Sequence, residues 1–270
     1  MCGIAGMFNR NLAPVDSDTL VHMTRTLTHR GPDEEGYFIN AGKLGGLEGG
    51  KGNVGLGHRR LSIIDLSSGQ QPLCNEDGTV WIAFNGEIYN FQELMQELKG
   101  LGHRFNTRSD TETIVHAYEQ CGEACVKRLR GMFAIAIWDE KKQQMVLARD
   151  RVGKKPLYYL EDSDRFLFGS EIKAILEGPN VSRDIDLTAL SDYLSLLYVP
   201  SPKSIFQDIR KLPAAHYAIV DKNGTTIRPY WDLPFHPNHE LSEDRMMDDL
   251  VGVLEEIKLN FRASAFSSEA

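Results

Sequence analysis

Four apolar segments follow one another closely between residues 132 and 168, and they constrain the fold more than any other feature of the sequence. Each is four to seven residues long, and polar or turn residues separate it from the next, as is typical of β-strands. The segments run from Met132 to Trp138, Gln144 to Arg149, Pro156 to Leu160 and Arg165 to Phe168. Strands that follow one another this closely leave no room for helices between them, so strict alternation of strands and helices is not expected in this part of the chain.

Helical patterns are grouped elsewhere in the chain. Leu20, Met23 and Leu27 recur at helical spacing, which predicts a helix from about Ser17 to His29. Two more helices are predicted from Phe91 to Gly100, where the glycine is expected to act as a left-handed cap, and after the capping box of 109–112. Runs of strands combined with runs of helices indicate an α+β fold built in layers.

The first six residues combine a reactive side chain with a strand. The segment Gly3 to Phe8 is small and apolar, which predicts a buried strand, and Cys2 stands at its start. Removal of Met1 would give Cys2 a free α-amine with a pKa of about 7.7–8.0, so one residue would carry both a nucleophilic thiol and a base. The hexapeptide alone leaves open that Cys2 is a small core residue.

Composition narrows the function classes. The chain has 270 residues, with 30 basic and 38 acidic side chains and a net charge of −8, so we expect neither nucleic acid nor a membrane as a partner. No apolar run approaches the roughly 18 residues of a membrane span, and we expect a cytoplasmic protein. The four cysteines lack the spacing of metal ligands, so no metal site is predicted.

Several motifs occur in an order that resembles a known family. They are Cys2-Gly3-Ile4-Ala5-Gly6, Arg30-Gly31-Pro32-Asp33, His58-Arg59-Arg60-Leu61-Ser62-Ile63-Ile64-Asp65, Gln71-Pro72-Leu73, Phe84-Asn85-Gly86-Glu87-Ile88-Tyr89-Asn90, Ser109-Asp110-Thr111-Glu112 and Arg149-Asp150-Arg151-Val152-Gly153-Lys154-Lys155-Pro156. Together they resemble the class II glutamine amidotransferases, and most of all the glutaminase half of the glutamine-dependent asparagine synthetases. The resemblance covers about residues 2 to 232.

The resemblance implies a fold and a division of the chain. The fold is the four-layer αββα sandwich of the N-terminal-nucleophile hydrolases, here with a short C-terminal extension. We expect a class II glutaminase domain over 1–180, a connector helix and hairpin over 181–242, and the incomplete start of a synthetase-type domain over 243–270.

The resemblance also implies a reaction and its residues. Cys2 would attack the side-chain amide carbon of L-glutamine, and water would then hydrolyse the thioester to glutamate. The Asn85 side chain and the Gly86 N–H would form the oxyanion hole, Arg60 would bind the substrate α-carboxylate, and Asp110, with Glu87 beside it, the α-ammonium. Each residue has a plainer interpretation: Asn85-Gly86 reads alone as a hairpin turn, Arg60 as a surface arginine and Asp110 as a helix-start carboxylate.

Other motif residues receive weaker assignments. The turn of Arg30 and Asp33 is expected to shape the pocket wall. His58 is expected to be a satisfied core histidine, since the mechanism needs no imidazole. Arg59 occupies a position that the family leaves open and receives no role.

One family feature has no counterpart in the sequence. A loop of the form Ser-Gly-Gly-x-Asp-Ser, which cradles pyrophosphate in the synthetase domain, does not occur. We therefore expect no cofactor for glutamine hydrolysis, with ATP and Mg needed only by a missing synthetase domain, and an ammonia-accepting synthetase domain or subunit as partner. Oligomeric state stays open, as do two alternatives: a non-catalytic glutamine-binding or assembly module, and the ammonia-donating subunit of a different amidotransferase.

Overall fold

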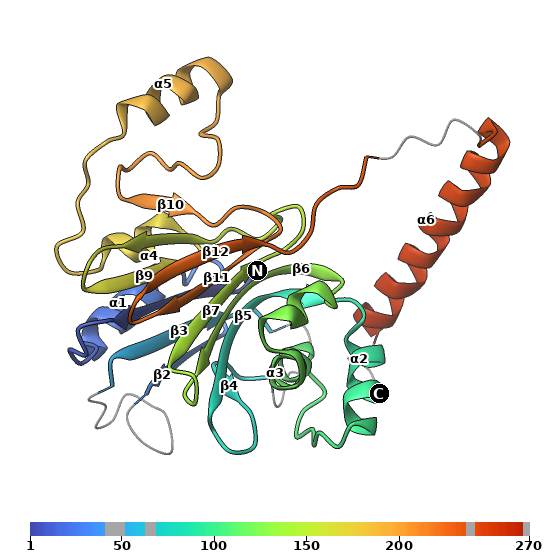
Figure 1. The fold of residues 1–270 in the computed structure, drawn as a ribbon, viewed down its shortest axis with the longest axis horizontal. Helices are drawn as coiled ribbons and strands as arrows, with labels where there is room; N and C mark the ends of the chain where they lie inside the picture. The colour runs from blue at the N-terminus through green and yellow to red at the C-terminus, as the bar shows by residue number, and fades with distance from the viewer. Residues whose placement is uncertain (41–51, 63–68, 236–240, 267–270) are drawn as a thin grey trace.

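Two antiparallel sheets of six strands form the centre of the molecule (Figure 1). The computed structural model describes residues 1–40, 52–62, 69–235 and 241–266, with backbone only for 259–266. The first sheet has the order β10-β8-β9-β1-β3-β2 and the second β12-β11-β7-β6-β5-β4. The strands of the first sheet are β1 (Gly3–Asn9), β2 (Glu34–Ile39), β3 (Val54–Arg60), β8 (Tyr158–Glu161), β9 (Arg165–Gly169) and β10 (Ile209–Lys211). Those of the second are β4 (Leu73–Cys74), β5 (Val80–Ile88), β6 (Gly131–Asp139), β7 (Gln144–Arg149), β11 (His216–Asp221) and β12 (Gly224–Pro229).

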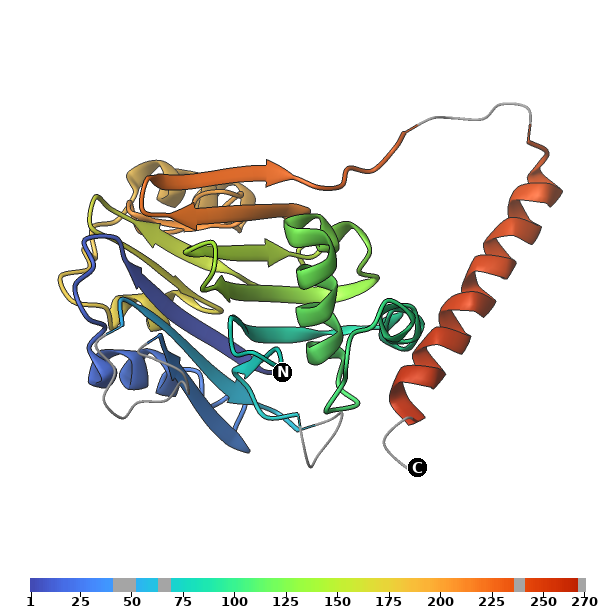
Figure 2. The same cartoon turned by 60° about the horizontal axis from the view of Figure 1, so that its bottom comes forward.

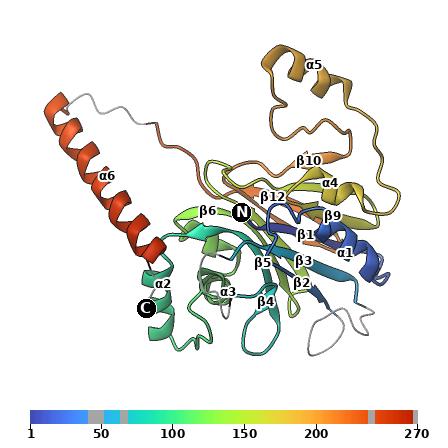
Figure 3. The same cartoon turned by 180° about the vertical axis from the view of Figure 1, so that it is seen from behind.

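Helices cover the outer face of each sheet. The helices α1 (Ser17–Arg25) and α4 (Ile172–Leu176) pack on the first sheet, and α2 (Phe91–Gly100), α3 (Asp110–Cys121) and the 3₁₀ helix η1 (Gly122–Lys127) on the second. Figures 1 and 3 show the two helical layers on opposite sides of the sheets. The order of layers is therefore αββα, as the sequence predicts.

Side-chain alternation along the strands explains the layering. On β6, Phe133, Ile135 and Ile137 face the helices α2 and α3, whereas Ala134, Ala136 and Trp138 face the other sheet. On β9, Phe166 and Phe168 point between the sheets and Leu167 points toward α1 and α4. Both faces of these strands are apolar because both are covered, which buries a core on each side of each sheet.

Two local predictions are wrong. The Asn-Gly pair predicts a turn after residue 84, but β5 continues to Ile88, and Asn85 and Gly86 pair with Ala134 and Phe133 of β6. Nine consecutive pairs with β6 outweigh the turn preference of two residues. The helix α2 includes Gly100, and the glycine with positive φ (99°) that follows it is Gly102.

The region after residue 180 contributes to the same sheets. Strand β10 adds to the first sheet, and the hairpin β11–β12, which turns at residues 222 and 223, forms the edge of the second. The helices α5 (Leu187–Leu196) and α6 (Glu243–Phe266) lie outside the four layers (Figure 2), and Glu256 of α6 lies 3.7 Å from Arg130, which precedes β6. The division at residues 180 and 242 stays a prediction, and 63–65 and 267–270 lie outside the described residues.

No helix within the described ranges is long and apolar enough to cross a membrane. The helix α6 has sufficient length, but charged residues such as Glu243, Asp248 and Lys258 interrupt its apolar positions.

Candidate active site

A cavity of about 160 Å³ brings together all six residues predicted for the site. They come from separate elements: Cys2 precedes β1, Arg60 ends β3, 85–87 lie near the end of β5, and Asp110 begins α3. The start of the chain lies beside β5 and β6 (Figures 1 and 3). The remaining lining residues are Met1, Leu61, Gly69, Gln71, Phe84, Ser109, Thr111, Met132 and Lys155.

The Cys2 thiol is held by backbone groups at the end of β3. Its sulfur accepts a hydrogen bond from the Leu61 N–H (3.4 Å), and the thiol contacts the Leu61 carbonyl oxygen at 3.7 Å. Burial raises the pKa of the Cys2 thiol, and the Leu61 hydrogen bond, the terminal amine, Arg60 and Lys155 act in the opposite direction. The thiolate, which is the nucleophilic form, thus depends on nearby positive charge and hydrogen-bond donors.

The backbone around Cys2 is fixed by the turn that precedes β2. The Arg30 Nε donates to the Cys2 carbonyl oxygen (3.0 Å), and its guanidinium also pairs with Glu171 (2.9 Å). The terminal amine belongs to Met1 here, and burial lowers its pKa. Arg30 therefore positions the start of the chain, which refines the expectation that its turn shapes the pocket wall.

Asn85 presents an amide without a partner. Its side chain is 1% exposed, and neither Oδ1 nor Nδ2 forms a hydrogen bond with a described residue. An unsatisfied buried amide is costly, on the order of 1–3 kcal/mol, so it is expected where a ligand supplies the missing partner. Asn85 lines the same cavity as Cys2.

The Gly86 N–H is directed toward the cavity by the pairing of β5. Opposite Gly86, the Phe133 N–H and carbonyl oxygen both bond to Asp150 (3.2 and 2.9 Å), so Gly86 and Phe133 form a pair that exchanges no hydrogen bonds. Backbone groups in such a pair point away from the partner strand. Along that edge, the Phe84 N–H donates to Gln71 (2.7 Å) and the Ile88 N–H to Asp110 (3.1 Å).

Asp110 is a buried carboxyl at the first position of α3. It is 5% exposed, and its Oδ2 accepts the Ile88 N–H. Burial, together with the nearby Glu87, raises the pKa of Asp110 to about 7. A cation bound beside Asp110 would favour the ionised form, so the site is suited to a substrate ammonium.

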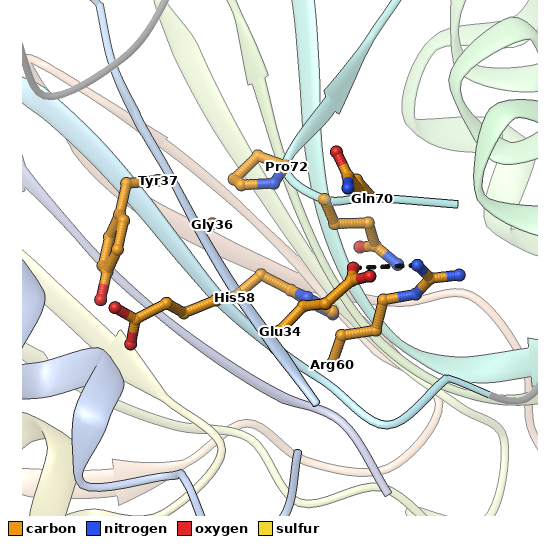
Figure 4. Close-up of a pocket in the computed structure, with 9 residues that line it drawn as sticks. Glu34, Gly36, Tyr37, His58, Arg60, Gln70 and Pro72 are labelled. Carbon is orange, nitrogen blue, oxygen red and sulfur yellow. Dashed lines mark hydrogen bonds and ion pairs between the residues drawn. The ribbon is translucent and has the colours of Figure 1, made fainter. Parts of the chain in front are cut away.

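Arg60 lies between the central cavity and a second one. Its Nη1 pairs with Glu34 of β2 at 2.9 Å, and both residues line a neighbouring cavity of about 410 Å³ with Tyr37, His58 and Gln70 (Figure 4). The Arg60 side chain is only 5% exposed. Glu34, which the sequence did not single out, thus fixes the guanidinium that would meet a substrate carboxylate.

Two further motif residues have structural roles. Arg59 donates to the carbonyl oxygens of Gly31 (2.8 Å) and Pro32 (3.2 Å) and pairs with Glu35 (2.7 Å), so it holds the turn that carries Arg30. His58 is buried and donates from Nε2 to the Phe84 carbonyl oxygen (3.0 Å), and burial lowers its pKa to about 4. His58 is thus a neutral core residue, as expected.

The capping box at α3 forms only in half. The Ser109 side chain accepts the Glu112 N–H (3.3 Å), but the Glu112 carboxylate bonds to the N–H groups of Asn106 (2.7 Å) and Thr107 (2.6 Å) instead of returning to Ser109. This arrangement fixes the loop before α3 and, with it, the position of Asp110.

One group of side chains has donors suited to a metal ion, among the residues described. His103, His116 and Glu119 place their ligand atoms within 4.8 Å of one another. They already pair among themselves, since His116 Nδ1 lies 2.7 Å from Glu119 and His103 Nδ1 lies 3.6 Å from it. None of the three lines the cavity that holds Cys2.

Two lining residues were missed by the sequence-based reasoning. Gln71 joins two sides of the cavity, because it accepts from the Phe84 N–H and donates to the Thr111 hydroxyl (3.1 Å). Lys155, which enters from the segment after β7, is 5% exposed. Both belong to motifs that carry the family resemblance, but no spacing signal connects either of them with Cys2.

Comparison with known proteins agrees with this arrangement. A family model for the glutamine amidotransferase domain matches residues 1–231. Asparagine synthetase [glutamine-hydrolyzing] 1 of Bacillus subtilis is 39% identical over 254 residues, which cover 93% of this chain and 38% of the relative. Putative asparagine synthetase [glutamine-hydrolyzing] 2 of Methanocaldococcus jannaschii is 38% identical over 253 residues, 87% of this chain and 47% of the relative.

Solved structures share the fold at lower identity. Glutamine phosphoribosylpyrophosphate amidotransferase from B. subtilis superposes with a TM-score of 0.62 at 20% identity, over 88% of this chain and 50% of that one. A regulatory enzyme of purine biosynthesis gives the same TM-score at 22% identity, over 85% of this chain and 49% of that one. The chain therefore shares its fold with these two enzymes.

Proposed function

The chain belongs to the glutamine amidotransferase family, and from this premise we propose that it hydrolyses L-glutamine to glutamate and ammonia. The observation that carries the proposal is the unpartnered Asn85 amide in the cavity of the Cys2 thiol. A buried nucleophile beside unused hydrogen-bond donors is the arrangement that acyl transfer requires.

The chemistry requires a chain that begins at Cys2. The free α-amine takes the proton of the thiol as the sulfur attacks the amide carbon, and a C–S bond forms. The Asn85 Nδ2 and the Gly86 N–H then bind the negative oxygen of the tetrahedral intermediate. The amine returns the proton to the departing nitrogen, ammonia leaves, and water hydrolyses the thioester to glutamate by the same sequence of steps.

Charges at the cavity wall select a free amino acid. Arg60, held by Glu34, offers a guanidinium to the α-carboxylate, and Asp110 offers its carboxylate to the α-ammonium, with Glu87 nearby. A peptide-bound glutamine lacks both charges and would leave the buried Asp110 carboxylate without a cation. Discrimination against such substrates is therefore expected to be strong.

The acceptor of the ammonia lies outside this chain in our proposal. The chain spans about two-fifths of the length of two asparagine synthetases from B. subtilis that it matches. Because those relatives are named asparagine synthetases, we propose an asparagine-forming synthetase domain or subunit as the acceptor. Hydrolysis itself needs no cofactor, whereas ATP and Mg would serve the synthetase reaction.

A substrate-specificity assay tests the proposal. The full chain, confirmed by mass spectrometry to begin at Cys2, is incubated with L-glutamine, D-glutamine or a glutamine whose α-amine is acetylated. Ammonia release is expected from L-glutamine alone, and Arg60→Met is expected to reduce it mainly through a higher KM. Equal turnover of acetylated and free L-glutamine would contradict the role of Asp110, and an unchanged KM in Arg60→Met would contradict that of Arg60.

A further inference from the structure

The Lys155 side chain lies in the cavity of Cys2 without a bonding partner. Lys155 is 5% exposed, lines the cavity, and its ammonium forms no hydrogen bond or ion pair with a described residue. Lysine residues with so little exposed surface are almost always paired, so the unpaired Lys155 side chain needs an explanation.

Neither of the two acidic side chains that act on the Lys155 charge, Asp150 and Glu87, forms an ion pair with the Lys155 ammonium. The buried Asp150 carboxylate accepts four backbone N–H groups, and its four donors are Phe133 (3.2 Å), Val152 (3.2 Å), Lys154 (2.8 Å) and Lys155 (2.9 Å). Glu87 lines the cavity but makes no ion pair with Lys155. Asp150 thus fixes the backbone of Lys155 and leaves its ammonium unpaired.

The backbone on either side of Lys155 is held firmly. The Arg149 guanidinium donates to the carbonyl oxygens of Lys155 (2.8 Å), Gly153 (2.9 Å) and Leu212 (2.8 Å), while Asp150 receives the Lys155 N–H. These bonds fix the backbone from which the Lys155 side chain extends into the cavity.

We propose that the Lys155 ammonium is the counter-charge of the Cys2 thiolate, a positioning residue that stabilises the negative sulfur inside the cavity as the amine takes the thiol proton. The inference rests on the proposed function, since it assumes that Cys2 is the nucleophile. It assigns a role to a residue for which the glutaminase mechanism described above has no use.

The electrostatics of the cavity support this role. Burial raises the pKa of the Cys2 thiol, and Lys155 is one of the positive charges that oppose the rise. Burial also lowers the pKa of Lys155, with Arg30 adding to the effect and Cys2, Glu87 and Asp150 opposing it. A thiolate beside Lys155 would stabilise both charged forms at once.

The charged groups that face Cys2 come from several elements. They are the terminal amine, Arg60 of β3, Lys155, and, around the amine, Arg30 and Asp33, while the carboxyl groups of Glu87 and Asp110 line the same cavity. Arg60 pairs with Glu34, and Arg30 pairs with Glu171, so the charge of each is already shared with a carboxylate. Lys155 has no such ion pair with a described residue.

A different role for Lys155 would be to bind the α-carboxylate of glutamine. Lys155 and Cys2 line one cavity, and the charge of each acts on the other. Arg60 already offers a guanidinium for the α-carboxylate, so that role does not require Lys155.

The test compares the reactivity of Cys2 in the full chain and its variants without substrate. Lys155→Met and Lys155→Gln remove the charge, Lys155→Arg keeps it, and Lys154→Met changes the exposed neighbour as a matched control. Iodoacetamide alkylation, in which the thiolate displaces iodide, is followed from pH 6 to 10, and peptide mass spectrometry separates Cys2 from Cys74, Cys121 and Cys125. Circular dichroism confirms folding.

The expected result is a shift of the Cys2 profile to higher pH by about one unit or more in the two neutral variants, with about tenfold slower alkylation at pH 7. Lys155→Arg and Lys154→Met should stay close to wild type, and Cys121 should react alike in all. An unchanged Cys2 profile in either neutral variant that folds would overturn the inference. If a higher KM accompanied that unchanged profile, Lys155 would be a substrate ligand instead.

The outcome separates this inference from the proposed function. A wild-type chain that begins at Cys2 but releases no glutamate contradicts the proposed function, whatever the alkylation shows. A wild-type chain that releases glutamate, together with unshifted neutral variants, contradicts only the role of Lys155. If both neutral variants failed to fold, Lys155→Arg would decide: a folded Lys155→Arg whose Cys2 profile moves up by one unit overturns the inference.

Discussion

Replacing Asp110 by asparagine should stabilise the fold while it removes the proposed ammonium site. The carboxyl is 5% exposed, and burial raises its pKa from 3.8 to about 7. Protonated Asp110 favours the folded state, and this contribution is lost as pH rises from about 4 to 7, because the folded protein holds the proton more tightly. The full difference corresponds to an upper bound of about 4 kcal/mol at pH 8.

The Asp110→Asn side chain stays neutral and keeps an oxygen for the Ile88 N–H. We therefore expect its free energy of unfolding to exceed that of wild type by about 2–4 kcal/mol at pH 8, and by about 1 kcal/mol less at pH 6. Urea denaturation at pH 6, 7, 8 and 9 measures both values, with the exposed Asp208→Asn as control, for which a change within about 0.5 kcal/mol is expected.

Two results would refute this reasoning. A variant less stable than wild type at pH 8 would mean that ionised Asp110 is already compensated by groups in the cavity. A difference that stays constant from pH 6 to 9 would mean that the pKa of Asp110 is not raised. In either case the carboxyl would no longer be a destabilising group retained for ligand binding.

Three further predictions concern the same cavity. Asn85→Ala should lower kcat by about 10²–10³-fold with little change in KM, measured by glutamate release, because a donor to the oxyanion is lost; a rise in KM alone would argue against that role. Gly86→Ala should lower the free energy of unfolding by about 1–3 kcal/mol in urea denaturation, since a Cβ would lie 2.2 Å from the Met132 carbonyl oxygen; unchanged stability would contradict the packing. The KM for glutamine should rise about tenfold from pH 8 to pH 6, as Asp110 with a pKa of about 7 becomes protonated; a flat KM profile would show that another group binds the ammonium.

The elements of the fold were predictable where the local pattern agreed with the final packing. Strands such as β7 (Gln144–Arg149) have apolar side chains on both faces, and the sequence shows them because both faces are buried. The turn preference of Asn85-Gly86 is misleading because it is local, whereas the strand conformation comes from β6, more than 40 residues later. Nor could local patterns show that β10–β12 complete the two sheets, since this depends on pairing with β8 and β7.

The residues that form the site were predictable from the sequence, whereas the contacts that hold them in place were less so. The order of the motifs predicts that Cys2, Asn85 and Asp110 belong to one site, and all three line the same cavity. The pair of Arg60 with Glu34 forms because β2 and β3 are in register, with residues 60 and 34 directly opposite. Lys155 reaches the cavity through a turn fixed by Asp150, which no spacing in the sequence reveals.

The central claim is that Cys2 acts as an amino-terminal nucleophile, and one comparison tests it most directly. Two forms of the otherwise identical chain are prepared, one beginning at Cys2 and one retaining Met1, each verified by intact mass, together with Cys2→Ala. We predict glutamate release from L-glutamine by the form that begins at Cys2 and background rates for the other two. Equal activity with Met1 in place, or activity that survives Cys2→Ala, would contradict the account.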